Sequence, residues 1–164
     1  MININLATKD DFNFFYEIKK NKDNMYWSGY SKEPSKEKLK DFFYNILNNQ
    51  DDINKRKIYI IKFKESKCGY LYFDPIDVKN AVISVAILDV FSGNGIGKLA
   101  VKNLIDIAFH NGVIKIIAEI REDNIRSKKL FTSIGFIETK EFRLMNIENI
   151  NKEIKMIQFE KSNN

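Results

Sequence analysis

Cysteine and histidine are almost absent from this sequence of 164 residues: Cys68 and His110 are the only examples. A single cysteine excludes an intramolecular disulfide and a cysteine-based metal cluster, and a single histidine excludes multi-histidine metal sites. His110 stands just before Asn111 and Gly112, at the expected end of a helix, where an imidazole interacts with the helix dipole. A Ser-His-Asp mechanism is therefore not favoured, and we expect no bound metal.

Long apolar runs and blocks of one charge are also lacking. No uncharged apolar stretch approaches the roughly 20 residues that span a bilayer, and the first residues, MININLATKDD, lack the basic and apolar regions of a signal peptide. The net charge of +5 comes mainly from lysines spread along the chain. We therefore expect a cytoplasmic protein that binds no membrane and no nucleic acid polymer, with a cationic surface that attracts small anions.

Apolar residues make up 44% of the chain and aromatic residues 13%, enough for the core of a single domain over residues 1–164. Hydrophobic periodicity predicts an α/β or α+β architecture, in which a mixed sheet carries helices on its faces. The strand before residue 92 and the strand at 113–120 should be its parallel pair. Strands are expected at 2–7, 56–66, 68–75, 80–91, 113–120, 136–144 and 153–160, helices at 8–20, 35–49, 95–111 and 124–134, and a loop at 21–34.

Three glycines at alternate positions, Gly93, Gly95 and Gly97, open the helix at 95–111. The first N–H groups of a helix lack intrahelical partners and carry partial positive charge, so they favour phosphate, and glycine lets the main chain approach it closely. The spacing is neither the dinucleotide fingerprint G-x-G-x-x-G nor the P-loop G-x-x-x-x-G-K-[ST]. By itself the segment is also typical of a loop that needs glycine only for its turn.

A second segment, AEIREDNIRSKKLFTSIGF at 118–136, follows at the distance of one helix and one strand. It places Asn124 and Ser127 on the first turn of the next helix and Gly135-Phe136 at its exit. With SGNGIG at 92–97, it resembles the GNAT superfamily of acyl-CoA-dependent N-acyltransferases. That family has Gln or Arg-x-x-Gly-x-Gly or Ala in the loop, then Asn-x-x-Ala or Ser-x-x-Leu-Tyr-x-x-x-Gly-Phe. The predicted element order agrees with its fold over essentially the whole chain.

The resemblance implies a sheet of about seven strands splayed between strands 4 and 5, about four helices, and acetyl-CoA as acyl donor. The pyrophosphate of coenzyme A would lie on main-chain N–H groups, and the pantetheine arm would pair with the strand before the glycine loop. Phe131 would lie near the thiol. The implied cofactor-binding residues are Ile87, Leu88, Val90, Gly93, Asn94, Gly95, Ile96, Gly97, Lys98, Asn124, Ser127 and Phe131.

Two positions depart from the family pattern. Ser92 stands where Gln or Arg is usual, which removes a side-chain donor but leaves the backbone N–H groups. Phe131 stands where many members have a tyrosine that protonates the departing thiolate. The chain then needs another proton donor, a water molecule, or direct departure of the thiolate.

Acyl transfer to an amine needs a base that removes a proton from the ammonium group and a donor that polarises the thioester carbonyl. Glu119 is the candidate base, because the run Glu-Ile-Arg-x-x-Asn resembles the segment that carries the base in bacterial N-terminal acetyltransferases of ribosomal proteins. An outward strand residue paired with a lysine is the competing interpretation. The N–H of Leu88 or Val90 is expected to face the carbonyl, and Ser84 is a second catalytic candidate that can instead bond a neighbouring strand.

Four aromatic residues are candidate acceptor contacts: Tyr26, Trp27, Tyr30 and Tyr72. Rings stack on base or sugar faces, although a loop also uses aromatic side chains as buried anchors. The segments at 26–28, 34–43 and 81–87 resemble members that acetylate nucleotide-linked amino sugars of surface glycans, with Lys38 where those members often have histidine. We expect a small-molecule amine acceptor and a possible homodimer. The alternatives are acetylation of a protein N-terminus or a polyamine, and an acyl-CoA-binding sensor without catalysis.

Overall fold

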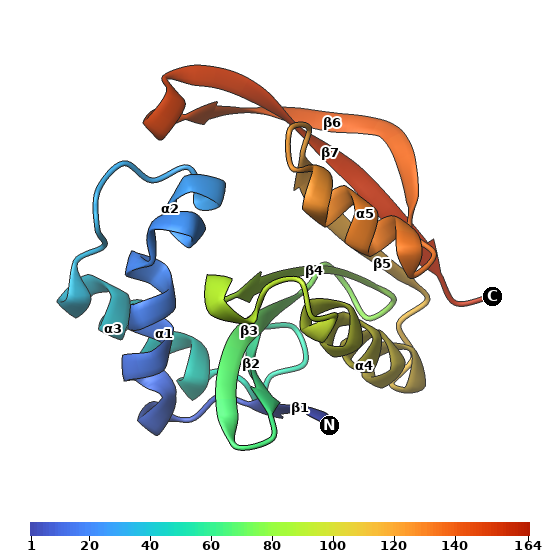
Figure 1. Ribbon diagram of the computed structural model, residues 1–164. Coiled ribbons are helices and arrows are strands. Elements are labelled where there is room, and N and C mark those ends of the chain that lie inside the picture. The colour runs from blue at the N-terminus through green and yellow to red at the C-terminus, as the bar shows by residue number, and fades with distance from the viewer.

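The computed structural model describes residues 1–164 with the exception of Asn149. The described residues form one seven-stranded sheet with α-helices on both faces (Figure 1). The elements are β1 (Ile2–Leu6), η1 (Lys9–Asp11), α1 (Phe12–Lys20), α2 (Lys22–Ser28), α3 (Lys36–Asn48), β2 (Lys57–Phe63), β3 (Ser66–Pro75), β4 (Asn80–Ile87), η2 (Asp89–Phe91), α4 (Ile96–His110), β5 (Lys115–Arg121), α5 (Ile125–Ser133), β6 (Ile137–Ile147), η3 (Glu148–Ile150) and β7 (Lys152–Ser162), where η marks a 3-10 helix.

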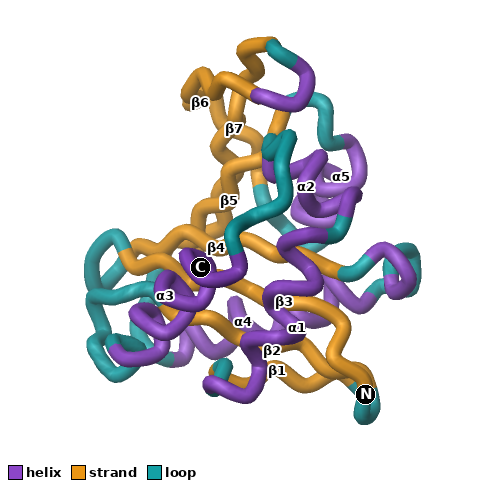
Figure 2. Tube along the Cα trace, turned by 90° about the vertical axis from the view of Figure 1, so that its left-hand side faces the viewer, coloured by secondary structure: helices purple, strands orange, loops and turns teal.

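The strands lie in the order β1-β2-β3-β4-β5-β7-β6. β2 to β4 form an antiparallel meander, because short turns connect strands with alternating apolar residues. β1 pairs antiparallel with β2, although α1, α2 and α3 lie between them in the chain. α4 then crosses over to bring β5 parallel to β4, and β7 and β6 continue the sheet antiparallel. The predicted mixed sheet and its parallel pair are confirmed. Figure 2 shows β5, β7 and β6 rising away from β1 to β3, as the twist of the sheet requires.

Two apolar cores cover the two faces of the sheet. On one face, α4 buries Ala100, Leu104 and Ala108 against β-strand residues, and Phe131 of α5 joins the same cluster. On the other face, α1 and α3 bury their own core, in which the rings of Phe15 and Phe43 lie 4.8 Å apart. The helical spacing of these apolar residues therefore decides which side of each helix packs against the sheet.

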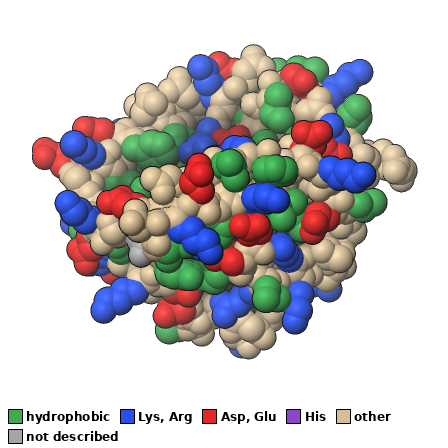
Figure 3. Space-filling model, turned by 90° about the horizontal axis from the view of Figure 1, so that it is seen from above, with side chains coloured by type: hydrophobic (Ala, Val, Ile, Leu, Met, Phe, Trp, Pro, Cys, Tyr) green, Lys and Arg blue, Asp and Glu red, His purple; other side chains and the backbone are tan. Residues whose placement is uncertain are grey.

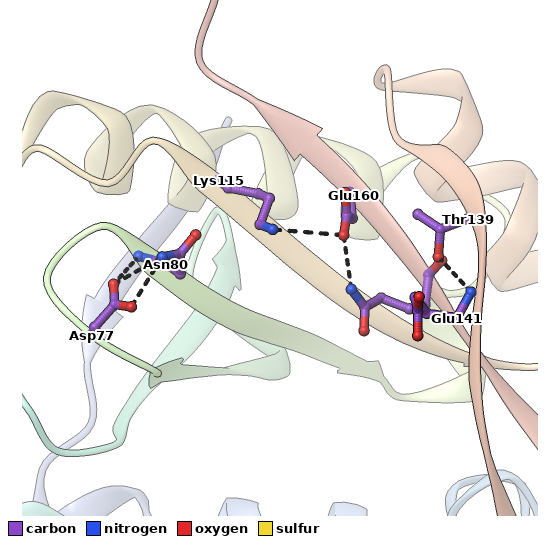
Figure 4. Close-up of polar contacts among 7 residues, drawn as sticks. Asp77, Asn80, Lys115, Thr139, Glu141 and Glu160 are labelled. Atoms are coloured by element: carbon purple, nitrogen blue, oxygen red, sulfur yellow. Dashed lines mark hydrogen bonds and ion pairs between the residues drawn. The ribbon is translucent and has the colours of Figure 1, made fainter.

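The pairing of β4 with β5 is short. It joins only Asn80, Ala81 and Val82 to residues 115–117, although both strands continue beyond these positions. Polar contacts support the paired end (Figure 4): the Asp77 carboxylate accepts from the N–H groups of Lys79 and Asn80, which lower the pKa of Asp77 together with the Asn80 amide. The sheet is thus closed at one end of this strand pair and open at the other.

Further contacts drawn in Figure 4 hold β5, β7 and β6 together beside that closed end. Lys115 of β5 lies 3.7 Å from the carboxylate of Glu160 on β7, which also accepts a hydrogen bond from Gln158. The Thr139 hydroxyl of β6 donates to the Gln158 carbonyl and accepts the N–H of Glu141. These side chains connect β5 to β7 and β7 to β6, in addition to the backbone hydrogen bonds between the strands.

The loop predicted at 21–34 is partly a helix, α2, which is a correction to the sequence-based prediction. Asn21 caps it by accepting from the N–H groups of Asp23 and Asn24, and Gly29 ends it at a φ of +83°. These start and stop signals are present in the sequence, but seven residues of polar and aromatic composition give no clear helical period. The described residues therefore form five α-helices, where about four were expected.

A second difference concerns the strand expected at 80–91. β4 ends at Ile87, and the 3-10 helix η2 takes the last positions, with the N–H of Phe91 donating to the Leu88 carbonyl. The apolar run alone does not reveal this end, since strand and 3-10 turn share the same residue types here.

Charged side chains are mixed over the surface. In Figure 3, which shows the molecule from above, basic and acidic side chains alternate across the visible face. None of the helices formed by the described residues is long and apolar enough to cross a membrane.

Replacing Gly69 tests how closely β3 and β4 approach each other. A Cβ at this position would lie 2.1 Å from the Ala86 carbonyl oxygen, so Gly69→Ala must push two paired strands apart. We expect the free energy of unfolding, measured by urea denaturation, to fall by about 3 kcal/mol. Gly112→Ala, where an added Cβ meets open space at a φ of +98°, should lower it by only about 1 kcal/mol. Equal losses would contradict the steric account.

Candidate active site

Beyond Val82 and Ile117, β4 and β5 separate, and this splay exposes one backbone edge of β4. The N–H of Leu88 donates to the Cys68 carbonyl at 2.9 Å, on the β3 side. Because successive N–H groups of a strand point to opposite edges, those of Val85 and Ile87 face the open side. They need partners from water or a ligand.

A groove of about 470 Å³ begins at this edge and runs to the start of α4. Gly93 and Gly95 lie in it with φ values of +82° and +76°, and an added Cβ at either would meet nothing within 4 Å. Gly95 is the N-cap of α4, and the first intrahelical bond is that of the Leu99 N–H. The N–H groups of residues 96–98 therefore lack helical partners and make an anion site at the floor of the groove.

α5 supplies the opposite wall of the groove. Its N-cap is Asn124, whose side chain accepts from the N–H of Ser127 at 3.1 Å, and both residues line the groove. Arg126 and Lys129 line it as well, and with Lys98 of α4 they bring three cationic side chains to the groove. Sequence reasoning missed Arg126 and Lys129. Their spacing of three residues on one helix face was the available signal.

Gly97 has a different role from the two glycines before it. It lies in α4 without a positive φ, and an added Cβ would lie 3.2 Å from Leu130 Cδ1 of α5 and 3.5 Å from the Ile87 side chain. Gly97 therefore allows α4 to pack closely against α5 and β4 at the splay.

A second cavity, of about 230 Å³, also lies at the splay and adjoins the groove. Its walls come from α1, α2, β3, β4, β5, α5 and β7. The lining residues are Lys19, Asn24, Trp27, Ser28, Tyr70, Tyr72, Ile83, Ser84, Val85, Ala86, Ala118, Glu119, Ile120, Arg121, Asn124, Ser127, Phe131 and Met156. The groove and this cavity share six of them: Asn24, Trp27, Val85, Ala86, Asn124 and Ser127. The two spaces therefore meet where β4 and β5 part.

Glu119 lines the cavity from β5, but its setting is not the apolar one expected. The side chain is 33% exposed, and its Oε2 accepts a hydrogen bond from Arg143 Nε of β6 at 2.7 Å. The expected pairing of an outward carboxylate is thus present, with arginine in place of lysine.

Other predicted residues are divided between the two spaces. Ser84 lines the cavity, and so does Phe131, which is 2% exposed and packs edge-on to Phe136. Ile87, Gly93, Gly95, Ile96, Gly97, Lys98, Asn124 and Ser127 line the groove. Leu88, Val90 and Asn94 line neither space.

The expected donors to the thioester carbonyl, Leu88 and Val90, are both engaged. The Leu88 N–H belongs to the β3 pairing, and the Val90 N–H donates to the Asp89 carboxylate at 2.9 Å. Val90 is also 76% exposed, outside the groove. Alternation along β4 explains Leu88, whose N–H lies on the β3 side. The early end of β4 explains Val90, because the chain turns away after Ile87.

Of the four aromatic candidates, Trp27 and Tyr72 line the second cavity, whereas Tyr26 and Tyr30 line neither the groove nor the cavity. Tyr26 and Tyr30 are 42% and 58% exposed. The Tyr26 ring instead packs edge-on against Trp27, with centroids 4.8 Å apart.

Arg121 holds α2 against β5, and sequence reasoning missed it. Its side chain is 3% exposed, donates through NH1 to the Tyr26 carbonyl at 2.8 Å, and forms a two-pronged bond with Asp123. Its guanidinium carbon lies 4.9 Å from the Trp27 ring centroid. The cation thus satisfies carbonyl groups at the C-terminal end of α2 and fixes the helix that carries Asn24 and Trp27.

Comparison with known proteins agrees with this geometry. Residues 2–137 match the family model described as an acetyltransferase (GNAT) domain. Spermidine N-acetyltransferase from Vibrio cholerae, solved with CoA and spermine, superposes with a TM-score of 0.84 at 14% identity, covering 98% of this chain and 95% of that one. Ribosomal-protein-alanine N-acetyltransferase from Brucella melitensis gives 0.77 at 20% identity, with 98% and 99% covered. An aminoglycoside acetyltransferase with coenzyme A gives 0.79 at 16%, with 99% and 95% covered.

No curated protein sequence matches the chain. At identities of 14–20%, the solved structures establish the shared fold, and the family model covers most of the chain. The chain belongs to the GNAT acetyltransferase family. It is an N-acetyltransferase with acetyl-CoA as its acyl donor.

Replacing Arg121 tests whether α2 depends on this clamp. Arg121→Lys keeps the charge but loses the planar fork, so we expect the free energy of unfolding to fall by about 2 kcal/mol and the KM for acetyl-CoA to rise. Lys115→Met, which removes the half-exposed pair with Glu160, should change stability by less than about 1 kcal/mol. An Arg121→Lys protein with unchanged stability and KM would show that α2 is held by other contacts.

Proposed function

We propose that the chain transfers the acetyl group of acetyl-CoA to the primary amine of a nucleotide-linked amino sugar, by direct attack within a ternary complex. The single observation that carries the proposal is the meeting of groove and cavity at the splay, where they share six lining residues. One space then takes the acyl donor and the other the acceptor, with the reacting atoms brought together between β4 and β5.

The groove fits coenzyme A. Its floor offers the unpaired N–H groups of residues 96–98, its walls offer Arg126 and Lys129, and two glycines leave the approach to the main chain open. A phosphate group suits this combination of helix N-terminus and cations. When bound there, acetyl-CoA supplies a thioester carbonyl for attack.

We assign the carbonyl-polarising role to the N–H of Val85 or Ile87, because alternation turns both toward the open edge of β4. Glu119, or a water molecule that it orients, accepts the proton of the acceptor ammonium. Ser84 lies on the face of β4 that Tyr72 shares and contributes a hydroxyl to the same cavity. Phe131 supplies no proton, so the thiolate is protonated by water or leaves as such.

The charges and rings of the cavity support a nucleotide-linked acceptor over a polyamine. Polyamines carry several positive charges and need acidic partners. Glu119 is the one carboxylate in the cavity lining, and Arg143 already pairs it. Lys19 and Trp27 instead offer a cation and a ring, which suit phosphate and a sugar or base face.

An acceptor panel tests the assignment. We expect release of free thiol from acetyl-CoA with UDP-linked amino sugars, and little release with spermidine, aminoglycosides or peptides bearing a free N-terminus. Turnover confined to peptides or polyamines would overturn the acceptor assignment. Tight CoA binding by calorimetry with no thiol release from any amine would instead indicate a sensor.

Glu119→Gln tests the proposed base. The amide keeps the shape and cannot accept the proton, so kcat should fall by about a hundredfold with the KM for acetyl-CoA unchanged. Glu138→Gln, at an exposed position of β6 outside both spaces, is the matched control and should retain full kcat. Unaltered turnover of Glu119→Gln would remove this residue from the mechanism.

A further inference from the structure

We propose that Lys19 and Tyr72 form a docking point for an acidic group of the acceptor, so that the enzyme selects amines that carry a phosphate or carboxylate. This inference rests on the proposed function, because it concerns the same cavity. It adds the residues that read the acceptor's charge and the chemical class they require.

Lys19 brings a positive charge to the cavity without an anionic partner. Its ammonium lies 5.2 Å from the ring centroids of Tyr70 and Tyr72 and 5.3 Å from that of Phe15. Within the described part of the chain, no carboxylate lies within 4.0 Å of it, although Lys20 next to it pairs with Glu17. The rings position the ammonium and leave its charge to be balanced by a ligand.

Tyr72 provides an unused hydrogen-bond donor in the same cavity. Its hydroxyl oxygen is buried and has no hydrogen-bond partner, a state shared among buried side-chain polar atoms of the described residues only with Asn24 Oδ1. Burial, reinforced by Tyr70, raises the pKa of Tyr72 well above its usual value, against the opposing effect of Arg56. The phenol therefore stays protonated and can donate a hydrogen bond to an oxygen atom of a ligand.

The orphaned hydroxyl is costly to the free protein, since a buried polar group without a partner loses its hydration. It lies at the wall shared with Lys19, and both residues line the cavity. A ligand oxygen with negative charge satisfies both groups at once, because Lys19 supplies charge and Tyr72 supplies direction.

Asn24 and the remaining charges of the cavity fit this arrangement. Asn24 Oδ1 is the second orphan and lines both spaces, where an acceptor N–H is the partner it lacks. Arg121 is already bound to Asp123 and α2, and Glu119 to Arg143. Lys19 is thus the charge left available to the acceptor's acidic group.

Tyr72→Phe gives the sharpest test, because function and stability should move in opposite directions. Loss of an unpartnered hydroxyl should leave the thermal midpoint unchanged or raised, since nothing in the free protein is broken. The kcat/KM for a UDP-linked amino sugar should fall about tenfold, as expected for a lost hydrogen bond to a charged group. A lowered thermal midpoint with unchanged kcat/KM would overturn the assignment.

Lys19→Gln tests the charge, with Lys20→Gln as its control on the same helix. Lys20 lies 5.0 Å from the Tyr16 ring, so the control loses a similar cation–ring contact outside both spaces. We expect Lys19→Gln to lower kcat/KM for the UDP-linked sugar by about ten- to a hundredfold, and Lys20→Gln to leave it unchanged. Equal effects of the two variants would show a general loss of surface charge.

Matched acceptors separate this inference from the proposed function. The wild-type enzyme should prefer an amino sugar phosphate or a UDP-linked amino sugar to the same free sugar. If a carboxylate also binds at the docking point, the enzyme should likewise prefer an amino acid to its amide. Lys19→Gln should abolish that preference. Efficient acetylation of neutral and acidic amines alike would overturn the docking point and leave acetyl transfer intact. If no amine is acetylated, calorimetry can compare the affinity of UDP for the wild-type protein and for Lys19→Gln, both saturated with CoA. Equal affinities would refute the docking point.

Discussion

The early end of pairing between β4 and β5 is the constraint on which the site depends. Three residue pairs join the strands, and beyond Val82 and Ile117 the backbone edge of β4 has no partner in the sheet. Unpaired backbone groups inside a fold require partners, and here the groove that leads to α4 and the adjoining cavity give a ligand access to them. The opening is therefore a binding surface built from main chain.

The splay is held from both sides. At the closed end, Asp77 fixes the turn into β4, and Lys115 ties β5 to β7 (Figure 4). At the open end, Gly97 lets α4 approach α5 and β4, while Arg121 anchors α2 over the gap. These contacts position the N-terminus of α4 and the Trp27 side chain of α2 without bridging β4 and β5. A ligand can therefore pair with the open edge of β4.

Much of the fold was predictable because its elements carry strong local signals. Alternating residues gave the strands, and the glycine loop followed by Asn124 and Gly135 gave the crossover and the GNAT resemblance. α2 was missed because its cap signals, Asn21 and Gly29, surround too few residues to establish a period. The end of β4 at Ile87 was missed because a 3-10 turn continues the same apolar run, and this turn leaves Val90 exposed outside the groove.

The site was less predictable because its contacts join segments far apart in sequence. Arg121 meets the carbonyl groups of α2 some 95 residues earlier, and Lys19 meets Tyr72 across two layers of the fold. No periodic pattern encodes such pairs. The setting of Glu119 likewise depends on Arg143 of β6, which lies beyond β7 in the sheet and reaches Glu119 of β5 across it.

Amide hydrogen exchange at residues 85–88, measured with and without coenzyme A, tests the account most directly. The N–H of Leu88 should exchange slowly in both states, because Cys68 accepts it. Those of Val85 and Ile87 should exchange quickly in the free protein and become protected when coenzyme A binds. Slow exchange of Val85 and Ile87 without ligand, or no protection on binding, would contradict a cofactor site built on the open edge of β4.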